Sequence, residues 1–459
     1  MISIVSNGSQ LIRNIYGDAS IYYDKFLCNP RADCITKRQG DGIADMVQPT
    51  PAIDIDRLRR SLDGVNAFGF NAVTGGYNRV GYSDADMAAR AWFADEMAGA
   101  GLRVSRDAVN NLFGRFGPAD GPCIMAGSHL DTVPEGGAFD GSLGVCAAFE
   151  CVRAMIDAGI TPKTAIVVTA TAEEEGRFGG MLGSQTITGA VTRDWIARAS
   201  DSEGVALTAA MQAQGLDPFA APDAAWRSGA IRAFLEMHIE QGPVLEQSGI
   251  PVGVAHGISG VCHLQIRFEG VANHSGTTPM DMRADAFAGL VTFAAGIPAL
   301  IAELGTDQSR ITVGKLNLEP NFAHTIPGTA EFSIIVRDTS EEVMRRLRTA
   351  AEARIADAAK AHGLTVSSEE KSWLPPVGLD SGLHALLRGE AERLGIACLD
   401  MPSGAGHDAQ TMQSLCPSGL IFVPSRNGVS HAPEEWSDWA EIEKGASLML
   451  AALTRLACE

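Results

Sequence analysis

Residues 164–171 read Thr164-Ala165-Ile166-Val167-Val168-Thr169-Ala170-Thr171. A continuous apolar run of this length, rich in β-branched residues, is typical of a strand that is buried on both faces. Similar runs occur at residues 122–127, 233–238 and 419–424. Helical spacing follows the first of these, at residues 141–158, with one apolar face made of Val145, Phe149, Val152 and Ile156. Buried strands that alternate with helices predict an α/β fold, with a mostly parallel sheet flanked by helices.

A different pattern fills the middle of the chain. Strands of alternating polarity and long helices are predicted there in the order β-α-β-β-α-β, at residues 263–268, 282–304, 310–318, 329–337, 340–362 and 364–368. This order is that of a ferredoxin-like α+β domain. The buried strands lie on both sides of it, so we predict a catalytic domain of residues 47–260 and 374–459 with residues 261–373 inserted.

The bulk composition excludes several classes of protein. The chain has 459 residues, with 36 basic against 55 acidic ones, and its net charge of −19 argues against a nucleic-acid surface. No run of 18 apolar residues is evident, so we predict no membrane span. Nine cysteines without a CxxC pair favour free thiols and a cytoplasmic location. Residues 1–46 lack the features of a signal peptide and are predicted to be a loose extension.

Imidazole and carboxylate side chains follow the ends of the buried strands. They are His129 and Asp131 after the first strand, Glu174 and Glu175 after the second, His238 at the end of the third and His431 after the fourth. Asp140 follows His129 by eleven residues on a glycine-containing loop. Ligands gather beyond the carboxyl ends of parallel strands, so one rim of the sheet is expected to collect these groups.

This set predicts a site for two divalent metal ions. We assign His129 and His238 to one ion, Glu175 and His431 to the other, and Asp140 to a bridging position. Imidazole and carboxylate donors suit zinc first, and also manganese or cobalt. Each motif alone also fits a solvated loop or a buried core histidine; the joint occurrence at successive strand ends carries the prediction.

Two further carboxylates have expected roles beside the ions. Asp131 follows His129 by two residues and is expected to accept the second N–H of that imidazole, which fixes its tautomer. Glu174 precedes a predicted ligand without being needed as one. It is therefore predicted to be the general base that takes a proton from metal-activated water and passes it to the leaving nitrogen.

From residue 53 to residue 456 the chain resembles the amidohydrolase branch of the M20 metallopeptidase family, which includes N-carbamoyl-L-amino-acid hydrolases, β-ureidopropionase and allantoate amidohydrolase. The resemblance rests on the motifs around Gly81-Tyr82-Ser83, Gly127–Val133, Phe139-Asp140-Gly141, Glu174-Glu175-Gly176, His238–Pro243, His274–Met280, Ile326-Pro327-Gly328, Gly404–Ala409 and Ser430-His431. It implies the same five metal ligands and the same general base. It also implies that the inserted domain is a lid through which the protein forms a homodimer.

The resemblance further implies which residues contact the substrate. They are His274, which stabilises an oxyanion, Arg337, which holds a carboxylate, Gln241, which pairs with a ureido group, and the backbone of Gly406. His274 and Arg337 are expected to reach the site of the neighbouring subunit. His324 stands where the family usually has asparagine, at the carboxylate-binding end. Other polar residues near these motifs are expected to have structural or supporting roles: Arg283, Asp285, His256, His263, His407 and Asp408.

The predicted function is metal-dependent hydrolysis of the carbamoyl C–N bond of an N-carbamoyl-L-amino acid or related ureido acid, releasing ammonia and carbon dioxide. Two alternatives use the same scaffold, namely an allantoate amidohydrolase and a dipeptidase or acyl-amino-acid hydrolase. A third, from another class, is a metal-dependent binding protein without catalysis. The presence of Glu174 beside a full ligand set argues against the third.

Overall fold

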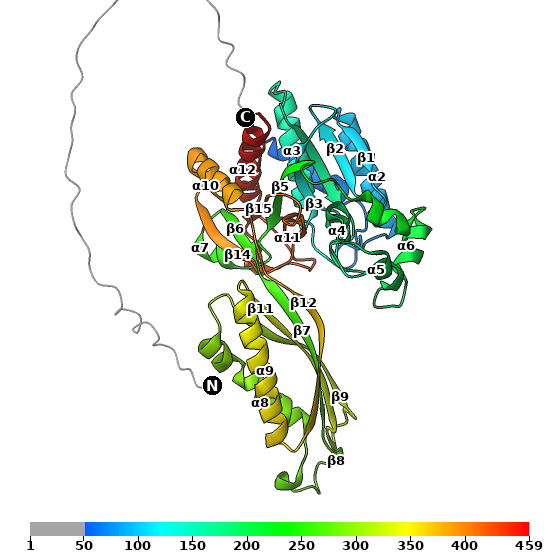
Figure 1. Ribbon diagram of the computed structural model, residues 1–459, viewed down its shortest axis with the longest axis vertical. Helices are drawn as coiled ribbons and strands as arrows, with labels where there is room; N and C mark the ends of the chain where they lie inside the picture. The colour runs from blue at the N-terminus through cyan, green and yellow to red at the C-terminus, as the bar shows by residue number, and fades with distance from the viewer. Residues whose placement is uncertain (1–50, 459) are drawn as a thin grey trace, which may run out of the picture. The chain divides into compact units, whose positions relative to one another are not determined.

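The computed structural model describes residues 51–458. The extension predicted at residues 1–46 lies outside the described residues. The described chain contains two main sheets, a nine-stranded one and a four-stranded one (Figure 1).

The larger sheet has the strand order β1-β2-β4-β3-β5-β15-β6-β13, with β14 paired to β6. Its strands are β1 Arg103–Arg106, β2 Leu112–Phe116, β3 Cys123–His129, β4 Ala165–Thr171, β5 Ile231–Ile239, β6 Val252–Ile258, β13 Val377–Gly378, β14 Cys398–Ser403 and β15 Ser418–Val423. The four central strands β4, β3, β5 and β15 are parallel. The fold prediction is confirmed, and the four predicted buried strands are these four.

The central strands are buried on both faces because helices cover each side of the sheet. Every residue of β3 and β4 is buried. At Gly127 a side chain is excluded, since a Cβ atom there would lie 1.9 Å from the carbonyl oxygen of Thr169 on β4. The one glycine thus allows the two strands to lie side by side immediately before His129.

One apolar core joins the larger sheet to five helices, α1 Ile55–Val65, α2 Asp84–Gly99, α3 Ser142–Asp157, α10 Ser381–Leu394 and α12 Trp439–Cys458. A second core on alternate residues of the same strands contains side chains from α4 Leu182–Thr188 and α11 Asp408–Met412. Shorter helices complete this part: α5 Arg193–Arg198, α6 Leu207–Ala213, α7 Val244–Ser248, η1 Pro218–Ala224 and η3 Arg426–Gly428.

The smaller sheet is antiparallel throughout, with the order β12-β7-β11-β9. Its elements follow the predicted β-α-β-β-α-β order as β7 Gly260–Glu269, α8 Ala286–Leu304, β9 Arg310–Glu319, β11 Thr329–Asp338, α9 Glu341–Ala361 and β12 Thr365–Leu374. Both helices pack on one face, where Phe268, Phe332 and Leu347 belong to a separate core. The opposite face carries no helix of this core.

Three details differ from the predicted elements. Helix α8 begins at Ala286, not at residue 282, because the Asp285 side chain accepts hydrogen bonds from the backbone of Phe287 and Ala288 and caps it. Strand β12 extends to Leu374. A two-stranded ribbon of β8 Asn273–His274 and β10 Thr325–Ile326 was not predicted, since two-residue strands carry no periodicity.

Helix α8 is the one helix of residues 51–458 that is long and apolar enough to cross a membrane, which the sequence reading did not recognise. Its buried side chains Leu290, Phe293 and Leu300 pack into the core of the smaller sheet. Only part of the apolar surface of α8 is covered in this way, since 22% of its most apolar 18-residue window is buried. The seven cysteines of the described residues are all free.

Candidate metal centre

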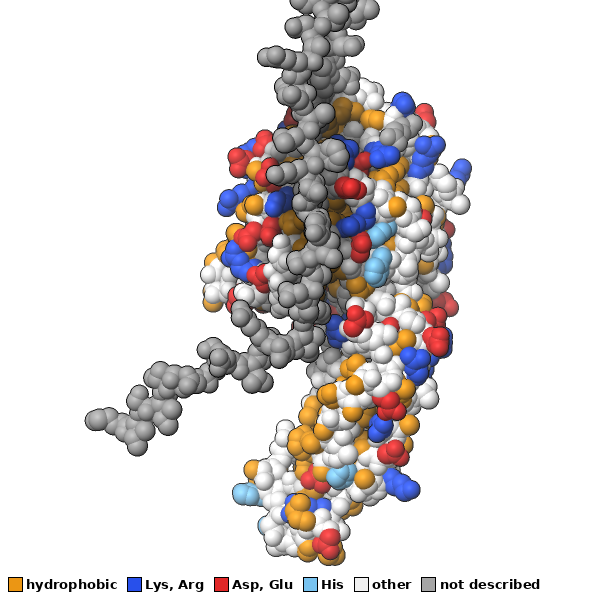
Figure 2. Space-filling view, turned by 90° about the vertical axis from the view of Figure 1, so that its left-hand side faces the viewer, with side chains coloured by type: hydrophobic (Ala, Val, Ile, Leu, Met, Phe, Trp, Pro, Cys, Tyr) orange, Lys and Arg blue, Asp and Glu red, His pale blue; other side chains and the backbone are white. Residues whose placement is uncertain are grey.

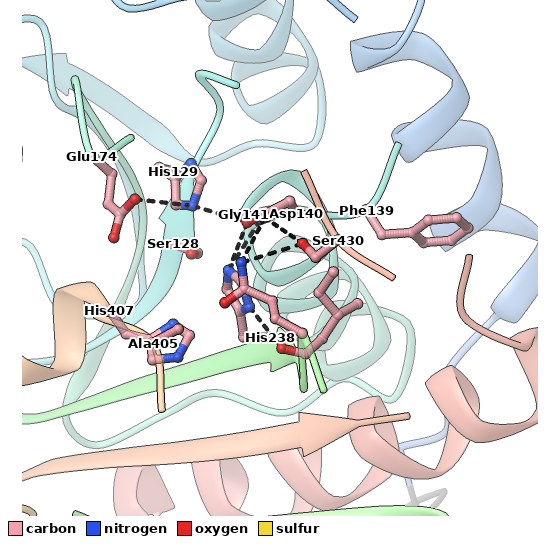
Figure 3. A network of polar contacts seen from close by, with 12 residues as sticks. Ser128, His129, Phe139, Asp140, Gly141, Glu174, His238, Ala405, His407 and Ser430 are labelled. Atoms are coloured by element: carbon pink, nitrogen blue, oxygen red, sulfur yellow. Dashed lines mark hydrogen bonds and ion pairs between the residues drawn. The ribbon is translucent and has the colours of Figure 1, made fainter. Parts of the chain in front are cut away.

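Two neighbouring strand ends and one loop form the first group of ligand atoms. His129 is the last residue of β3, and His238 is the penultimate residue of the adjacent parallel strand β5. Asp140 precedes α3, and its Oδ1 lies 3.0 Å from His238 Nε2 and 3.5 Å from His129 Nε2 (Figure 3). The ligand atoms of these three buried residues lie within 4.8 Å of one another.

A second group shares Asp140. Its Oδ2 atom lies 3.2 Å from His431 Nε2, which in turn lies 3.5 Å from Glu175 Oε2. The ligand atoms of Asp140, Glu175 and His431 lie within 4.8 Å of one another. One carboxylate oxygen of Asp140 therefore faces each group, which is the arrangement that a bridging ligand requires.

The approach of α3 to these ligands depends on Gly141. Its φ is +61°, and a Cβ atom at this position would lie 2.3 Å from the His129 ring. Its backbone N–H points to His238 Nε2 at 3.3 Å. The small residue thus lets the helix start directly beside both imidazoles.

His431 does not directly follow a strand, although this was expected. Strand β15 ends at Val423, so the histidine does not directly follow it, and helix η3 lies between them. His431 has a φ of +57°, a conformation uncommon for a residue with a side chain. The loop, and not the strand end, brings this ring to Asp140.

Charge in the site fits divalent cations. Glu174, Glu175, Asp140 and Asp131 lie together with little solvent exposure. The Oε1 atom of Glu175 is buried without a hydrogen-bond partner. Burial and the charge of Asp140 raise the pKa of Glu175 to about 7. Buried carboxylates need a compensating positive charge, so the two ligand groups are suited to hold metal ions.

The same carboxylates raise the pKa values of the imidazoles. Burial alone would lower the pKa of His129, but Glu174 and Asp140 raise it well above its usual value. Contact with Asp140 raises the pKa of His431 to about 9, against the effect of burial. A cation between these groups would supply the positive charge that a proton otherwise supplies.

Glu174 lies beside the first group without being part of either. Its Oε2 atom is 3.6 Å from His129 Nε2, and Figure 3 shows the carboxylate directed toward that ring. Burial, opposed by His129 and reinforced by Glu175, raises the pKa of Glu174 well above its usual value. A carboxyl group with a raised pKa can both accept and return a proton near neutral pH.

The expected contact between the Asp131 carboxylate and His129 is wrong in its detail. His129 Nδ1 lies 2.9 Å from the backbone carbonyl oxygen of Asp131, while the carboxylate Oδ1 is 4.0 Å away. The carboxylate instead accepts a hydrogen bond from the Glu175 backbone N–H and lies 3.5 Å from the buried Arg90. Backbone carbonyls orient both imidazoles, since His238 Nδ1 lies 2.9 Å from the oxygen of Ile239.

Gln241 joins the metal centre to a cavity of about 520 Å³. Its Nε2 atom donates to Asp140 Oδ2 at 2.8 Å and lies 3.2 Å from His431 Nε2. Arg337 from β11 also lines this cavity, and its Nη1 donates to the Gly404 oxygen at 2.7 Å. Within its own chain, Arg337 thus contacts the backbone of Gly404 in the wall of this cavity. Gly406 lies two residues beyond Gly404. A Cβ atom at Gly406 would lie 2.9 Å from the Met181 side chain.

His274 and His324 do not join these residues within the described chain. Their contacts are local to the β8–β10 ribbon, where the Ser275 N–H donates to the His324 oxygen at 3.0 Å. The N–H groups of Gly276 and Thr277 point to His274 Nδ1. The His274 side chain is therefore held in position at an exposed site, away from its own chain's ligands.

The remaining polar residues have the supporting contacts that were expected. The His407 ring packs against His238 with centroids 4.6 Å apart, and its Nε2 lies 2.9 Å from Ser403 Oγ. Asp408 accepts a hydrogen bond from Thr171 at 2.5 Å. Arg283 donates to two backbone carbonyls of its own loop. His256 lies on β6 and His263 on β7.

Glu435 is a positioning residue that the sequence analysis missed. Its Oε1 accepts hydrogen bonds from the backbone N–H groups of Phe139 and Asp140, at 2.9 and 3.0 Å. Its Oε2 accepts from Ser430 Oγ at 2.8 Å and from the His431 N–H at 3.3 Å. One buried carboxylate therefore ties the loop of Asp140 to the loop of His431.

Known proteins are similar to this chain over most of its length. Residues 125–455 match the model of peptidase family M20/M25/M40. An N-carbamoyl-L-amino acid amidohydrolase of Geobacillus stearothermophilus is 36% identical over 84% of this chain and 94% of its own length. The allantoate amidohydrolase of Bacillus subtilis is 35% identical, over 83% and 93%.

A crystal structure of an amidase of the hydantoinase/carbamoylase family from Burkholderia multivorans superposes with a TM-score of 0.82. It is 32% identical to this chain, and the match covers 90% of this chain and 100% of the other. The chain therefore belongs to peptidase family M20/M25/M40, in its hydantoinase/carbamoylase branch.

Proposed function

We propose that this protein is a dinuclear metal-dependent amidohydrolase that cleaves the carbamoyl C–N bond of an N-carbamoyl-L-amino acid or related ureido acid. The products are the amino acid, ammonia and carbon dioxide. The observation that carries the proposal is Asp140, whose two oxygens face two separate ligand groups beside the free carboxylate of Glu174. The relatives named above are amidohydrolases of ureido compounds, which supports this bond class.

Two zinc ions, or manganese or cobalt ions, would be held by His129, His238, Glu175 and His431, with Asp140 between them. When bound, such ions activate water and polarise the scissile carbonyl. Glu174 then takes the proton from water at its carboxylate and delivers it to the leaving nitrogen. Asp131 supports the site through the Glu175 backbone.

The substrate groups are proposed for the cavity beside this centre. Gln241 pairs with the ureido amide, and Arg337 holds the carboxylate with its planar guanidinium. The Gly406 backbone faces the same substrate, and His324 adjusts specificity at the carboxylate end. Allantoate is the first alternative substrate, because the Bacillus subtilis relative is named for it. A dipeptide or acyl-amino acid is the second.

A substrate panel tests this function. The metal-free protein is loaded separately with zinc, manganese or cobalt, and ammonia is measured with carbamoyl amino acids, allantoate and dipeptides; amino-acid release is followed for the dipeptides. We expect ammonia from the ureido compounds and no cleavage of dipeptides. Cleavage of dipeptides alone would replace the proposed bond class, and absence of turnover with every metal would favour a binding protein.

We also propose that residues 261–373 form a lid through which two copies associate. Exposed apolar side chains support this, namely Phe287 and Val291 on α8 and Leu316 on the edge strand β9. Figure 2 shows hydrophobic side chains gathered over this part of the molecule. The free buried thiols support a cytoplasmic location.

In such a homodimer, His274 would complete the neighbouring site and stabilise the oxyanion there. Mixing His274→Ala protein with Glu174→Gln protein tests this directly. After subunit exchange, half of the dimers are mixed, and each of these has one intact site. We expect about a quarter of the wild-type rate to return. If His274 acts in its own subunit, the mixture stays inactive.

A further inference from the structure

Two arginines face the same cavity from neighbouring strands. Arg337 of β11 and Arg310 of β9 are directly opposite each other in the antiparallel register. Opposite residues in such a pair project from the same face of the sheet. Both line the cavity of about 520 Å³ that also contains Gln241. Like charges opposite each other destabilise a sheet. A bound anion would relieve this repulsion.

No carboxylate of residues 51–458 forms an ion pair with either arginine. Among residues 51–458, Arg337 donates to the Gly404 oxygen, and Arg310 donates to the oxygens of Asp307 and Ser309. Neither guanidinium forms an ion pair with an acidic side chain of the described chain. Burial lowers the pKa of Arg337.

The acidic residues that line the cavity are already engaged elsewhere. Asp400 lies 3.3 Å from Arg388 Nε and 3.1 Å from His384 Nε2. Glu240 accepts hydrogen bonds from the backbone N–H groups of Val244 and Leu245, at 2.7 and 2.8 Å. The cavity therefore presents two guanidinium groups whose natural counter-charge is a ligand.

The position of the cavity sets the geometry of that ligand. Gln241, which lines the cavity, donates a hydrogen bond to Asp140 of the metal centre. The lid strands contribute Arg337 and Arg310 to the same cavity, and Leu399 and Met401 add apolar surface. A ligand that fills this cavity would thus combine a ureido group at Gln241, a short aliphatic segment and negative charge at the two arginines.

We propose that Arg310 acts beside Arg337 as a specificity-determining residue, and that the preferred substrates are ureido acids with two carboxylates, such as the N-carbamoyl derivatives of glutamate and aspartate. Arg337 holds the α-carboxylate, and Arg310 holds the side-chain carboxylate. This inference rests on the proposed hydrolysis of ureido bonds and names the substrate class for that reaction.

The test compares N-carbamoyl-L-glutamate with N-carbamoyl-L-glutamine, which has nearly the same shape and one fewer charge. The wild-type protein is expected to have the higher kcat/KM with the glutamate derivative. In Arg310→Ala, kcat/KM should fall by roughly 10- to 100-fold for the glutamate derivative, as expected for loss of a charge-assisted hydrogen bond. For the glutamine derivative it should change by less than roughly threefold.

Arg267→Ala is the matched control. Arg267 lies on β7 of the same sheet but outside the cavity, and it pairs with Glu269 and Glu331. The Arg267→Ala substitution should leave kcat/KM unchanged for both substrates. An equal loss for both substrates in Arg310→Ala would mean that both arginines hold one carboxylate, and it would overturn the proposal. Equal wild-type rates for the two substrates would overturn it as well.

A binding measurement separates this inference from the proposed function. Calorimetry on the Glu174→Gln protein, loaded with zinc, should give tighter binding of N-carbamoyl-L-glutamate than of N-carbamoyl-L-glutamine, and Arg310→Ala in that background should remove the difference. If wild-type protein hydrolyses no ureido compound yet this difference persists, the reaction is wrong and the anion site stands. If hydrolysis occurs and the difference in affinity is absent, Arg310 does not bind the side-chain carboxylate and the inference is wrong.

Discussion

Replacing Glu174 with glutamine is expected to lower kcat for a carbamoyl amino acid by roughly 10²- to 10⁴-fold, the range that general acid–base catalysis contributes. Glutamine keeps the size of the side chain but cannot accept a proton from water. The Glu174 carboxylate is 3.6 Å from His129 Nε2 and belongs to neither ligand group. Metal content, measured by mass spectrometry, should therefore stay at the wild-type level.

Glu175→Gln is the matched control, because it changes the adjacent residue in the same way. Glu175 contacts His431 within the second ligand group. This variant should lose bound metal together with activity, whereas Glu174→Gln should lose activity alone. Near-normal kcat in Glu174→Gln would remove that residue from the proton-transfer role. Loss of metal from Glu174→Gln would make it a ligand instead.

The central strands could be predicted because each has a continuous apolar run in its own sequence. Residues 165–171 form a continuous apolar run, and every one of them is buried in β4. By contrast, β1 has four residues, of which Arg103, Ser105 and Arg106 are exposed, so it has no apolar pattern. The edge strand β13 has two residues. Such strands exist because a neighbour pairs with them, and this information is not local.

The site likewise has features that the local sequence predicts and features that it does not. The two-residue spacing of His129 and Asp131 predicted that they lie together, but it does not tell whether the carboxylate or the carbonyl meets the ring. The structure selects the carbonyl, at 2.9 Å. Glu435 is separated from Asp140 by 295 residues, and no spacing rule connects them. Its only sequence signal is an acidic residue four positions after His431, in a loop expected to reach the site.

Replacing Asp140 with asparagine is expected to empty both metal positions and to abolish turnover. Burial would raise the pKa of Asp140, but His238, His129 and His431 lower it well below its usual value, so the carboxylate is ionised. Asparagine removes this charge and one of the two acceptor oxygens. Metal affinity should fall by more than the roughly 10- to 100-fold that loss of an outer hydrogen-bond partner costs.

The comparison that isolates the bridging role is His238→Ala, which removes a ligand of the first group and leaves Asp140, Glu175 and His431 of the second in place. That variant should retain one tightly held ion, at Glu175 and His431, and titration with zinc should show one strong site. Asp140→Asn should show no strong site, because its two oxygens face both groups. If Asp140→Asn retained one ion as His238→Ala does, the carboxylate would serve a single metal and the dinuclear arrangement would not hold. Asp400→Asn, an exposed carboxylate of the cavity wall paired with Arg388, should leave both ions in place.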